Sequence, residues 1–180
     1  MSLTQLRSRG ILDGTITAGD FASGVGGKVL QVVSTTKTDT FTGALGDTWY
    51  TVTGLSASIT PSSTSSKILI SGHVMGSSQD ADAKKRFYVK IQKGGSDIAI
   101  GDAAGSRLRV HNSSFSDDGA NNATVPINFL DSPSSTSSLS YTIQVRDDTS
   151  GVRVNAAPAD NDNDTYPRAT STITLMEIAG

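Results

Sequence analysis

Apolar and polar residues alternate along much of this chain with a period of two, the pattern of a strand that buries one of its faces. In the clearest run, Arg86–Lys93, every second residue is apolar, namely Phe87, Val89 and Ile91. The run Ser171–Ile178 alternates in the same way, so we expect the C-terminal end of the sequence to lie within a sheet.

The same pattern predicts short strands throughout and no helix longer than a turn. The predicted strands are 28–33, 48–53, 67–74, 86–93, 97–100, 106–111, 124–130, 140–146, 152–155 and 171–178. Gly94-Gly95 predicts a tight hairpin after the run 86–93, and the segment 148–151 predicts a second hairpin. Short strands separated by such turns indicate an all-β fold, an antiparallel β-sandwich or jelly roll.

Three long polar segments, 76–85, 112–122 and 156–169, separate the predicted strands and exceed the length of a minimal hairpin. The sequence leaves open whether 97–100 and 106–111 form one strand or two. An extra strand reverses the direction of everything after it, so the sequence also leaves open which polar segments share an end of the sandwich.

Composition supports the all-β prediction and argues against several functions. All but one of the 17 acidic residues are Asp, the exception being Glu177, and Asp favours turns over helix interiors. A net charge of −2 leaves no basic surplus for a phosphate backbone, which argues against nucleic acid as a partner. The absence of cysteine excludes disulfides and thiolate chemistry. No apolar run approaches the ~18 residues of a membrane-spanning helix.

Residues 1–27 differ in composition from residues 28–180, which are predicted to form one β-sandwich domain. The first segment carries isolated apolar residues among Gly, Asp and Thr: Ile11, Leu12, Ile16 and Phe21. So short a segment cannot bury those side chains by itself. We interpret it as an extended arm that orders against sister chains or a docking site on another protein, and the alternative is a disordered leader.

The candidate chemical motifs are incomplete. The Gly-rich run 24–28 lacks the first Gly and the hydroxyl residue of a phosphate loop, and a strand instead of a helix follows it. The acidic run 160–164 has Thr165 where an EF-hand calcium loop has Gly, although a looser oxygen site stays an alternative. His73 and His111 are the two histidines, and neither has an evident partner. We therefore predict no catalytic, cofactor or metal site.

Several separated segments together resemble a domain that recurs in tail-fibre proteins of bacteriophages. They are 27–33, 58–70, 101–107, 130–133 and 165–180, and they occur in that family's order. The resemblance covers Gly27–Gly180 and implies a β-sandwich fibre domain, a homotrimer, and a virion protein that attaches to the host cell surface. The alternative kind of virion protein is a capsid-mounted fibre or decoration protein. A polysaccharide depolymerase is an alternative from another class of protein.

The resemblance makes recognition of the host surface the expected role, and we assign it to the long polar segments. Candidate receptor-binding residues are Lys84 and Lys85 in a local basic cluster, with Phe115 and Tyr166 as apolar surface for a sugar ring or peptide. The expected partners are a host-surface glycan or protein, sister chains, and a tail, baseplate or other adaptor protein that binds the arm. We expect the protein in the virion after assembly in the host cytoplasm, without metal, cofactor, nucleic acid or membrane insertion.

Deleting residues 1–26 should leave a folded domain that still binds host cells and no longer joins the virion, because the composition changes at Gly24–Gly27. Incorporation into particles and cell binding are measured side by side for the truncated and the full-length protein. Normal incorporation of the truncated protein would show that docking lies elsewhere in the chain.

Overall fold

The computed structural model describes residues 28–80, 85–116 and 121–180. Within these ranges the chain forms strands and loops without helices, which confirms the all-β prediction. The strands are β1 (Val29–Lys37), β2 (Phe41–Gly43), β3 (Tyr50–Ile59), β4 (Lys67–Ser78), β5 (Lys85–Lys93), β6 (Ser96–Ile98), β7 (Asn112–Ser116), β8 (Ala123–Asp131), β9 (Leu139–Asp147), β10 (Val152–Val154) and β11 (Ser171–Ile178). The arm candidates lie outside the described residues: Ile11, Leu12, Ile16 and Phe21.

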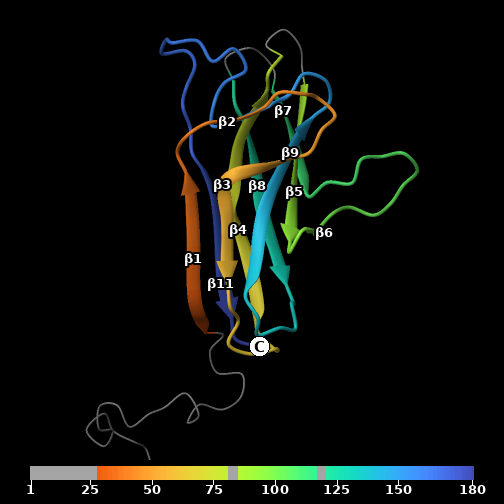
Figure 1. Cartoon of the computed structure of the whole chain (residues 1–180), viewed down its shortest axis with the longest axis vertical. Helices are drawn as coiled ribbons and strands as arrows, with labels where there is room; N and C mark the ends of the chain where they lie inside the picture. The colour runs from red at the N-terminus through yellow and green to blue at the C-terminus, as the bar shows by residue number, and fades with distance from the viewer. Residues whose placement is uncertain (1–27, 81–84, 117–120) are drawn as a thin grey trace, which may run out of the picture.

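The strands form two antiparallel sheets that pack face to face (Figure 1). In sheet A, β11 lies between β1 and β4, and β8 pairs with the other edge of β4. In sheet B, β9 lies between β3 and β5, and β7 pairs with the other edge of β5. The orders β1-β11-β4-β8 and β3-β9-β5-β7 are those of a jelly roll, so the predicted architecture is confirmed. Short strands extend both sheets: β10 joins β4 to β2, and β6 pairs with the end of β5.

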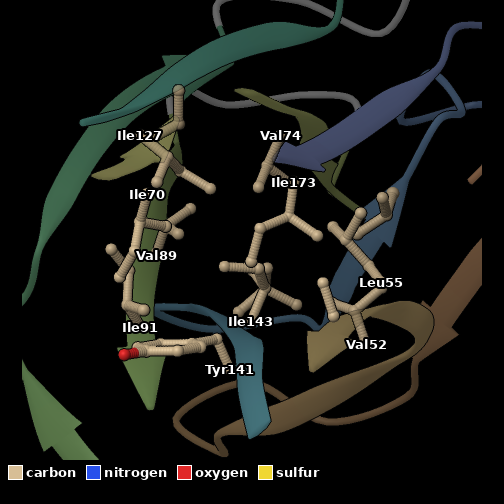
Figure 2. Close-up of a cluster of buried hydrophobic side chains, with 14 of the residues drawn as sticks. Val52, Leu55, Ile70, Val74, Val89, Ile91, Ile127, Tyr141, Ile143 and Ile173 are labelled. Carbon is tan, nitrogen blue, oxygen red and sulfur yellow. The ribbon is translucent and has the colours of Figure 1, made fainter. Parts of the chain in front are cut away.

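The core lies between the sheets and consists of the apolar half of each alternating strand. Ile70, Val74 and Ile173 from sheet A and Val89 and Ile143 from sheet B point into this space, and all are fully buried (Figure 2). Removing each such side chain from water stabilises the folded state by roughly 1.5–3 kcal/mol. Because aromatic residues make up only 6% of the chain, branched aliphatic side chains supply most of this stabilisation.

A polar cluster links the two sheets at one end of the core. The buried Tyr141 hydroxyl donates to Asp131 Oδ2 at 2.7 Å, and the Lys93 ammonium donates to the two oxygens of the same carboxylate at 3.0 and 2.7 Å. Burial, and after it the hydrogen bond to Asp131, raise the pKa of Tyr141, so the phenol donates as a neutral group. Asp131 ends β8 in sheet A, whereas its two partners lie in sheet B.

Residues 106–111 are not a strand, contrary to the prediction. Leu108 and Val110 alternate with polar neighbours, but the loop 99–111 closes on itself, with the Gly101 N–H donating to the Val110 carbonyl at 3.2 Å. A local alternation without a partner strand does not form a sheet.

Strand β7 occupies the start of the segment 112–122, which was expected to be a loop. Its sequence is polar except for Phe115, so it carries no alternating apolar signal. It becomes a strand because the edge of β5 hydrogen-bonds it, in a register that runs from Lys85 opposite Ser116 to Val89 opposite Asn112. The sequence also missed β2 and the second half of β3.

One of the two predicted hairpins is confirmed and the other is wrong. Gly94 and Gly95 connect β5 to β6 with φ angles of 55° and 84°, the left-handed conformation that a type I′ turn requires. The segment 148–151 instead crosses between the sheets, because β9 belongs to sheet B and β10 to sheet A. The buried Asp147 carboxylate holds this crossing by accepting the N–H groups of Ser150 and Gly151.

The sandwich has two distinct ends. At the base, the Ala179 N–H donates to the Lys28 carbonyl at 2.9 Å, so the first and last residues of the described domain lie together (Figure 1). At the opposite end, which we call the loop end, Gly76 of β4 lies opposite Ala123 of β8, and β10 pairs with the last residues of β4. The described parts of all three long polar segments therefore lie at the loop end, which resolves the arrangement that the sequence left open.

A buried carboxylate ties the last strand to the base. Glu177 is 1% exposed and accepts hydrogen bonds of 2.7 Å from the Ser62 N–H, the Ser62 and Ser66 hydroxyls and the Gln31 amide. Burial by itself would raise the pKa of Glu177, but the hydrogen bonds from Gln31, Ser62 and Ser66 outweigh it and lower the pKa to about 2. The carboxylate thereby holds the turn 61–66 and β1 against β11.

Glu177→Gln should lower the free energy of unfolding at pH 7 by roughly 1.5–3 kcal/mol, the range of hydrogen bonds to a charged group. The folded pKa lies below the ordinary 4.5, so the stabilisation is fully present above about pH 4.5 and is lost as the pH falls toward 2. Denaturant unfolding over this pH window measures both effects, with the exposed Asp162→Asn as control. Equal stability of Glu177→Gln and the parent protein at pH 7 would contradict this account.

Candidate functional site on the outer face of sheet B

The solvent-facing side of sheet B gathers aromatic, charged and amide side chains. The alternation that points Phe87, Val89 and Ile91 into the core points their neighbours outward. The outward residues of three neighbouring strands are Arg86, Tyr88, Lys90 and Gln92 on β5, Thr142, Gln144 and Arg146 on β9, and Ser113 and Phe115 on β7. We call this surface, with Trp49 and Asp97 beside it, the mixed face.

The centre of the mixed face is a cation held between a ring and a carboxylate. The Lys90 ammonium lies 4.4 Å from the centroid of the Trp49 ring and 2.6 Å from Asp97 Oδ2. The Gln92 amide donates to the other oxygen of Asp97 at 2.9 Å. A cation over an indole contributes about 0.5–1 kcal/mol at an exposed site and more where water is excluded. Trp49 belongs to the loop before β3 and not to a strand. Its contact with Lys90 nevertheless holds the ring against the mixed face.

The charge balance of this cluster follows from the Asp97 carboxylate. Partial burial by itself would raise the pKa of Asp97, but hydrogen bonds from Lys90 and Gln92 and the charges of Lys90 and Arg109 lower it. Asp97 is therefore ionised at neutral pH and neutralises the neighbouring ammonium.

A second cluster lies toward the loop end of the same face. The Arg86 guanidinium lies 5.4 Å from the centroid of Phe115 and 3.4 Å from Asp148 Oδ2. Arg146 pairs with Asp47, which belongs to the loop before β3. Burial, and after it the Asp148 carboxylate, raise the pKa of Tyr88 between these groups, so Tyr88 stays a neutral phenol. Phe115 is 56% exposed and offers one of the most accessible aromatic surfaces in the described ranges.

The loop 99–111 flanks the mixed face at the edge of β5 and projects away from the sheet (Figure 1). Arg109 Nε donates to the Gly101 carbonyl at 2.7 Å, and Arg107 donates to the Ala104 carbonyl at 3.2 Å. These contacts hold the loop as a closed unit. Arg109 lies close enough to Asp97 for its charge to lower the pKa of that carboxyl group.

This arrangement is suited to a polyhydroxyl ligand. Each of the cations Lys90, Arg86 and Arg146 already has a carboxylate partner, so the face presents donors and acceptors without a large net charge. Aromatic rings add apolar contact area at low conformational cost. Ring faces beside alternating donors and acceptors match the apolar and hydroxyl faces of a sugar.

The residues proposed from the sequence have different places. Phe115 lies on β7 within the mixed face, and Lys85 is the first residue of β5, with its ammonium 3.3 Å from Asp80. Tyr166 is half-buried in the loop before β11, and its N–H donates to the Asn163 carbonyl at 3.2 Å. Lys84 lies outside the described residues. Lys85 and Phe115 lie on neighbouring strands at the loop end, but the alternation of β5 and β7 points them to opposite faces of sheet B, and Tyr166 lies in a separate loop of the same end.

Sequence reasoning missed Trp49, Tyr88 and Lys90. The signal was present in the run 86–93, whose polar half was read only as the solvated side of a strand. Trp49 is also the single tryptophan of the chain. The sequence could not show that charged residues of β9 and of the loop before β3 lie beside the polar residues of the run 86–93.

The groups considered for chemistry have structural partners. His73 Nε2 lies 3.0 Å from the Thr170 carbonyl oxygen, and His111 Nδ1 lies 3.1 Å from the Ala99 carbonyl oxygen. Asp160, from the acidic run 160–164, pairs with Arg153 and Arg168. In the described parts of the chain, no group of three His, Cys, Asp or Glu residues could hold a metal ion. None of the described residues belongs to a helix long and apolar enough to cross a membrane.

Comparison with known proteins identifies no family, since neither a family model nor a curated protein sequence matches the chain. Solved viral structures are similar at low identity. A structure of infectious bursal disease virus, strain Gx, is 14% identical with a TM-score of 0.43, over 83% of this chain and 42% of that chain. T=1 particles derived from the same virus give 12% identity and a TM-score of 0.40, over 83% of this chain and 36% of that chain.

A third structure, the VP2 subviral particle of infectious bursal disease virus, is 13% identical with a TM-score of 0.36 and covers 83% of this chain and 41% of that chain. The chain thus spans less than half the length of each of these three proteins. Similarity at this level leaves the role of the chain to be inferred from its own residues.

Lys90→Met should raise the pKa of Asp97, because the partial burial of the carboxyl group then loses the opposing ammonium. Titration of the side-chain carboxyl carbons by nuclear magnetic resonance measures this pKa in the variant and the parent. Lys67→Met, at the base of sheet A, serves as the control and should leave Asp97 unchanged. An Asp97 titration that is identical in Lys90→Met and the parent would show that the central cluster is not formed in solution.

Proposed function

We propose that the chain is a structural protein of a virion, a trimeric tail fibre, that attaches to a glycan on the host surface through the mixed face and the loop end. The arrangement of the two ends carries the proposal. Residues 1–27 precede Lys28 at the base, whereas the candidate residues gather at the opposite end and on one outer face. A protein mounted through its arm presents these surfaces away from the mount.

The chemistry of the mixed face favours a glycan over a strongly charged partner. Its cations are already paired with carboxylates, so a polyanion would have to displace Asp47, Asp97 and Asp148. Sugar hydroxyls can instead share the remaining donor and acceptor positions of these groups. Binding of this kind is weak for one copy, and several copies on one fibre supply avidity.

The candidates named from the sequence, Lys84, Lys85, Phe115 and Tyr166, belong to the same proposal. Phe115 lies in the mixed face, Lys85 begins β5 at the loop end, and Tyr166 lies in the loop that the Asn122 amide joins by donating to the Pro167 carbonyl at 3.4 Å. Recognition by these residues needs neither metal nor catalysis. A capsid-mounted fibre or decoration protein could use the same face, so the two alternatives differ in the mount and not in the ligand.

Trp49→Ala and Tyr88→Ala should each weaken binding to host cells and to isolated host-surface glycan by about tenfold, which corresponds to 1.4 kcal/mol. Lys85→Ala, Phe115→Ala and Tyr166→Ala test the loop end in the same assay. Addition of glycan to the parent protein should also change the fluorescence of Trp49, the single tryptophan of the chain. Asn128→Ala, on an exposed position of β8 in sheet A, is the control and should bind as the parent does.

Unaltered binding by all five variants would overturn the assignment of the site. Binding that a chelator alone abolishes would point to a metal-dependent site instead. New reducing ends after incubation with host glycan would favour the depolymerase alternative over a binding protein.

A further inference from the structure

The loop 99–111 carries two guanidinium groups without an acidic partner. In the described part of the chain Arg107 and Arg109 form no ion pair, whereas a carboxylate pairs with each cation on the central strands of the mixed face. The loop contains one acidic residue, Asp102, so with His111 neutral its net charge is +1, in a chain whose net charge is −2. The loop therefore holds positive charge that the protein itself does not neutralise.

Each of the two guanidinium groups is oriented by a carbonyl of the loop and keeps most of its donors. Arg109 Nε donates to the Gly101 carbonyl at 2.7 Å, and Arg107 Nη1 donates to the Ala104 carbonyl at 3.2 Å. A guanidinium has five N–H donors in a fixed fork, so one such bond leaves the others for a ligand. Side chains that are oriented in advance lose less conformational entropy when a ligand binds.

The backbone of the loop holds this arrangement in the open. The Gly101 N–H donates to the Val110 carbonyl at 3.2 Å, and the His111 N–H donates to the Val89 carbonyl of β5 at 2.9 Å. These bonds join the two limbs of the loop to each other and to the edge of sheet B. All of residues 101–109 are exposed, so a ligand can reach both guanidinium groups.

Arg109 connects the loop to the centre of the mixed face. It interacts electrostatically with Asp97, whose carboxylate lies 2.6 Å from the Lys90 ammonium. That ammonium in turn lies 4.4 Å from the centroid of the Trp49 ring. The free donors of Arg109 therefore border the surface on which a sugar ring is proposed to lie.

We propose that the loop 99–111 is a subsite for an acidic group of the glycan, a carboxylate or a sulfate ester, with Arg107 and Arg109 as its donors. This rests on the proposed function and adds to it the class of sugar. The planar fork of a guanidinium offers two parallel N–H groups to two oxygens of such an anion, and these charge-assisted hydrogen bonds are stronger than those between neutral groups. An acidic sugar joins such a group to a ring whose hydroxyls and apolar face suit the mixed face.

The division between paired and unpaired cations decides where the acidic group binds. On the mixed face an anion would have to displace Asp97 or Asp148 from its cation. At the loop no carboxylate has to be displaced from either arginine. The sugar ring therefore lies over the mixed face, and its acidic group points to the loop.

The test uses the full-length protein and matched sugars. Methyl glucuronide carries a carboxylate, methyl glucoside is the same ring with a neutral hydroxymethyl group, and a sulfated glucose carries the other anion. Titration of the loop amides, followed by nuclear magnetic resonance, gives the affinity for each sugar. The parent should bind the glucuronide or the sulfated glucose about tenfold more tightly than the glucoside. Arg109→Gln should remove this preference, and Arg109→Lys should restore only part of it, because an ammonium lacks the fork.

Lys67→Gln is the matched control, since Lys67 is another exposed cation without an ion pair among the described residues, at the start of β4 in sheet A. It should keep the preference, which excludes an effect of net charge alone. Equal affinity of the parent for all three sugars would overturn the inference, as would a preference that both Arg107→Gln and Arg109→Gln keep. Inorganic sulfate that binds as tightly as the acidic sugars would also overturn it. Circular dichroism identifies any variant that fails to fold.

Trp49→Ala separates the subsite from the proposed function. A parent without preference for the acidic sugars, together with weaker binding of all three by Trp49→Ala, would remove the subsite and leave the mixed face as the receptor site. A preference that depends on Arg109 and not on Trp49 would leave the subsite standing and remove the ring from the proposed receptor site.

Discussion

The pairing of β11 with β1 on one side and β4 on the other is the constraint on which this fold depends. It joins residues as distant as Ser34 and Thr174, which lie 140 positions apart, so sheet A closes only when the whole domain is present. The strand brings Ile173 and Leu175 into the core, and its Glu177 carboxylate fastens the turn at the base. The outer face of sheet A exists only because this strand fills its centre.

The two outer faces divide the chemistry of the molecule. The outward positions of β1, β11, β4 and β8 in sheet A carry one charged residue, Lys67 near the base, whereas sheet B presents paired charges and aromatic rings that extend to the loop end. Both faces arise from the same alternation, since every second side chain of a strand points into the core and the side chains between them point to solvent. In the proposed fibre, sheet B meets the host.

Much of the fold could be predicted from the sequence, because most strands carry their own alternation. The run 86–93, the Gly94-Gly95 turn and the last strand are correct for that reason. The errors occur where pairing decides the outcome: β7 is a polar segment that the edge of β5 recruits, and 106–111 alternates without a partner. The candidate site was harder to predict than the fold, because its residues come from four strands and a loop. No local sequence pattern indicates that these residues lie together.

The central claim, that the chain is a virion protein whose loop end faces outward, is tested most directly by electron microscopy of virions. Purified particles are imaged with an antibody fragment against the loop 156–169, which lies at the loop end (Figure 1). The account predicts label at the outer tips of fibres, displaced from the point where the arm is mounted. Particles without label, or label confined to the surface from which the fibres emerge, would contradict it.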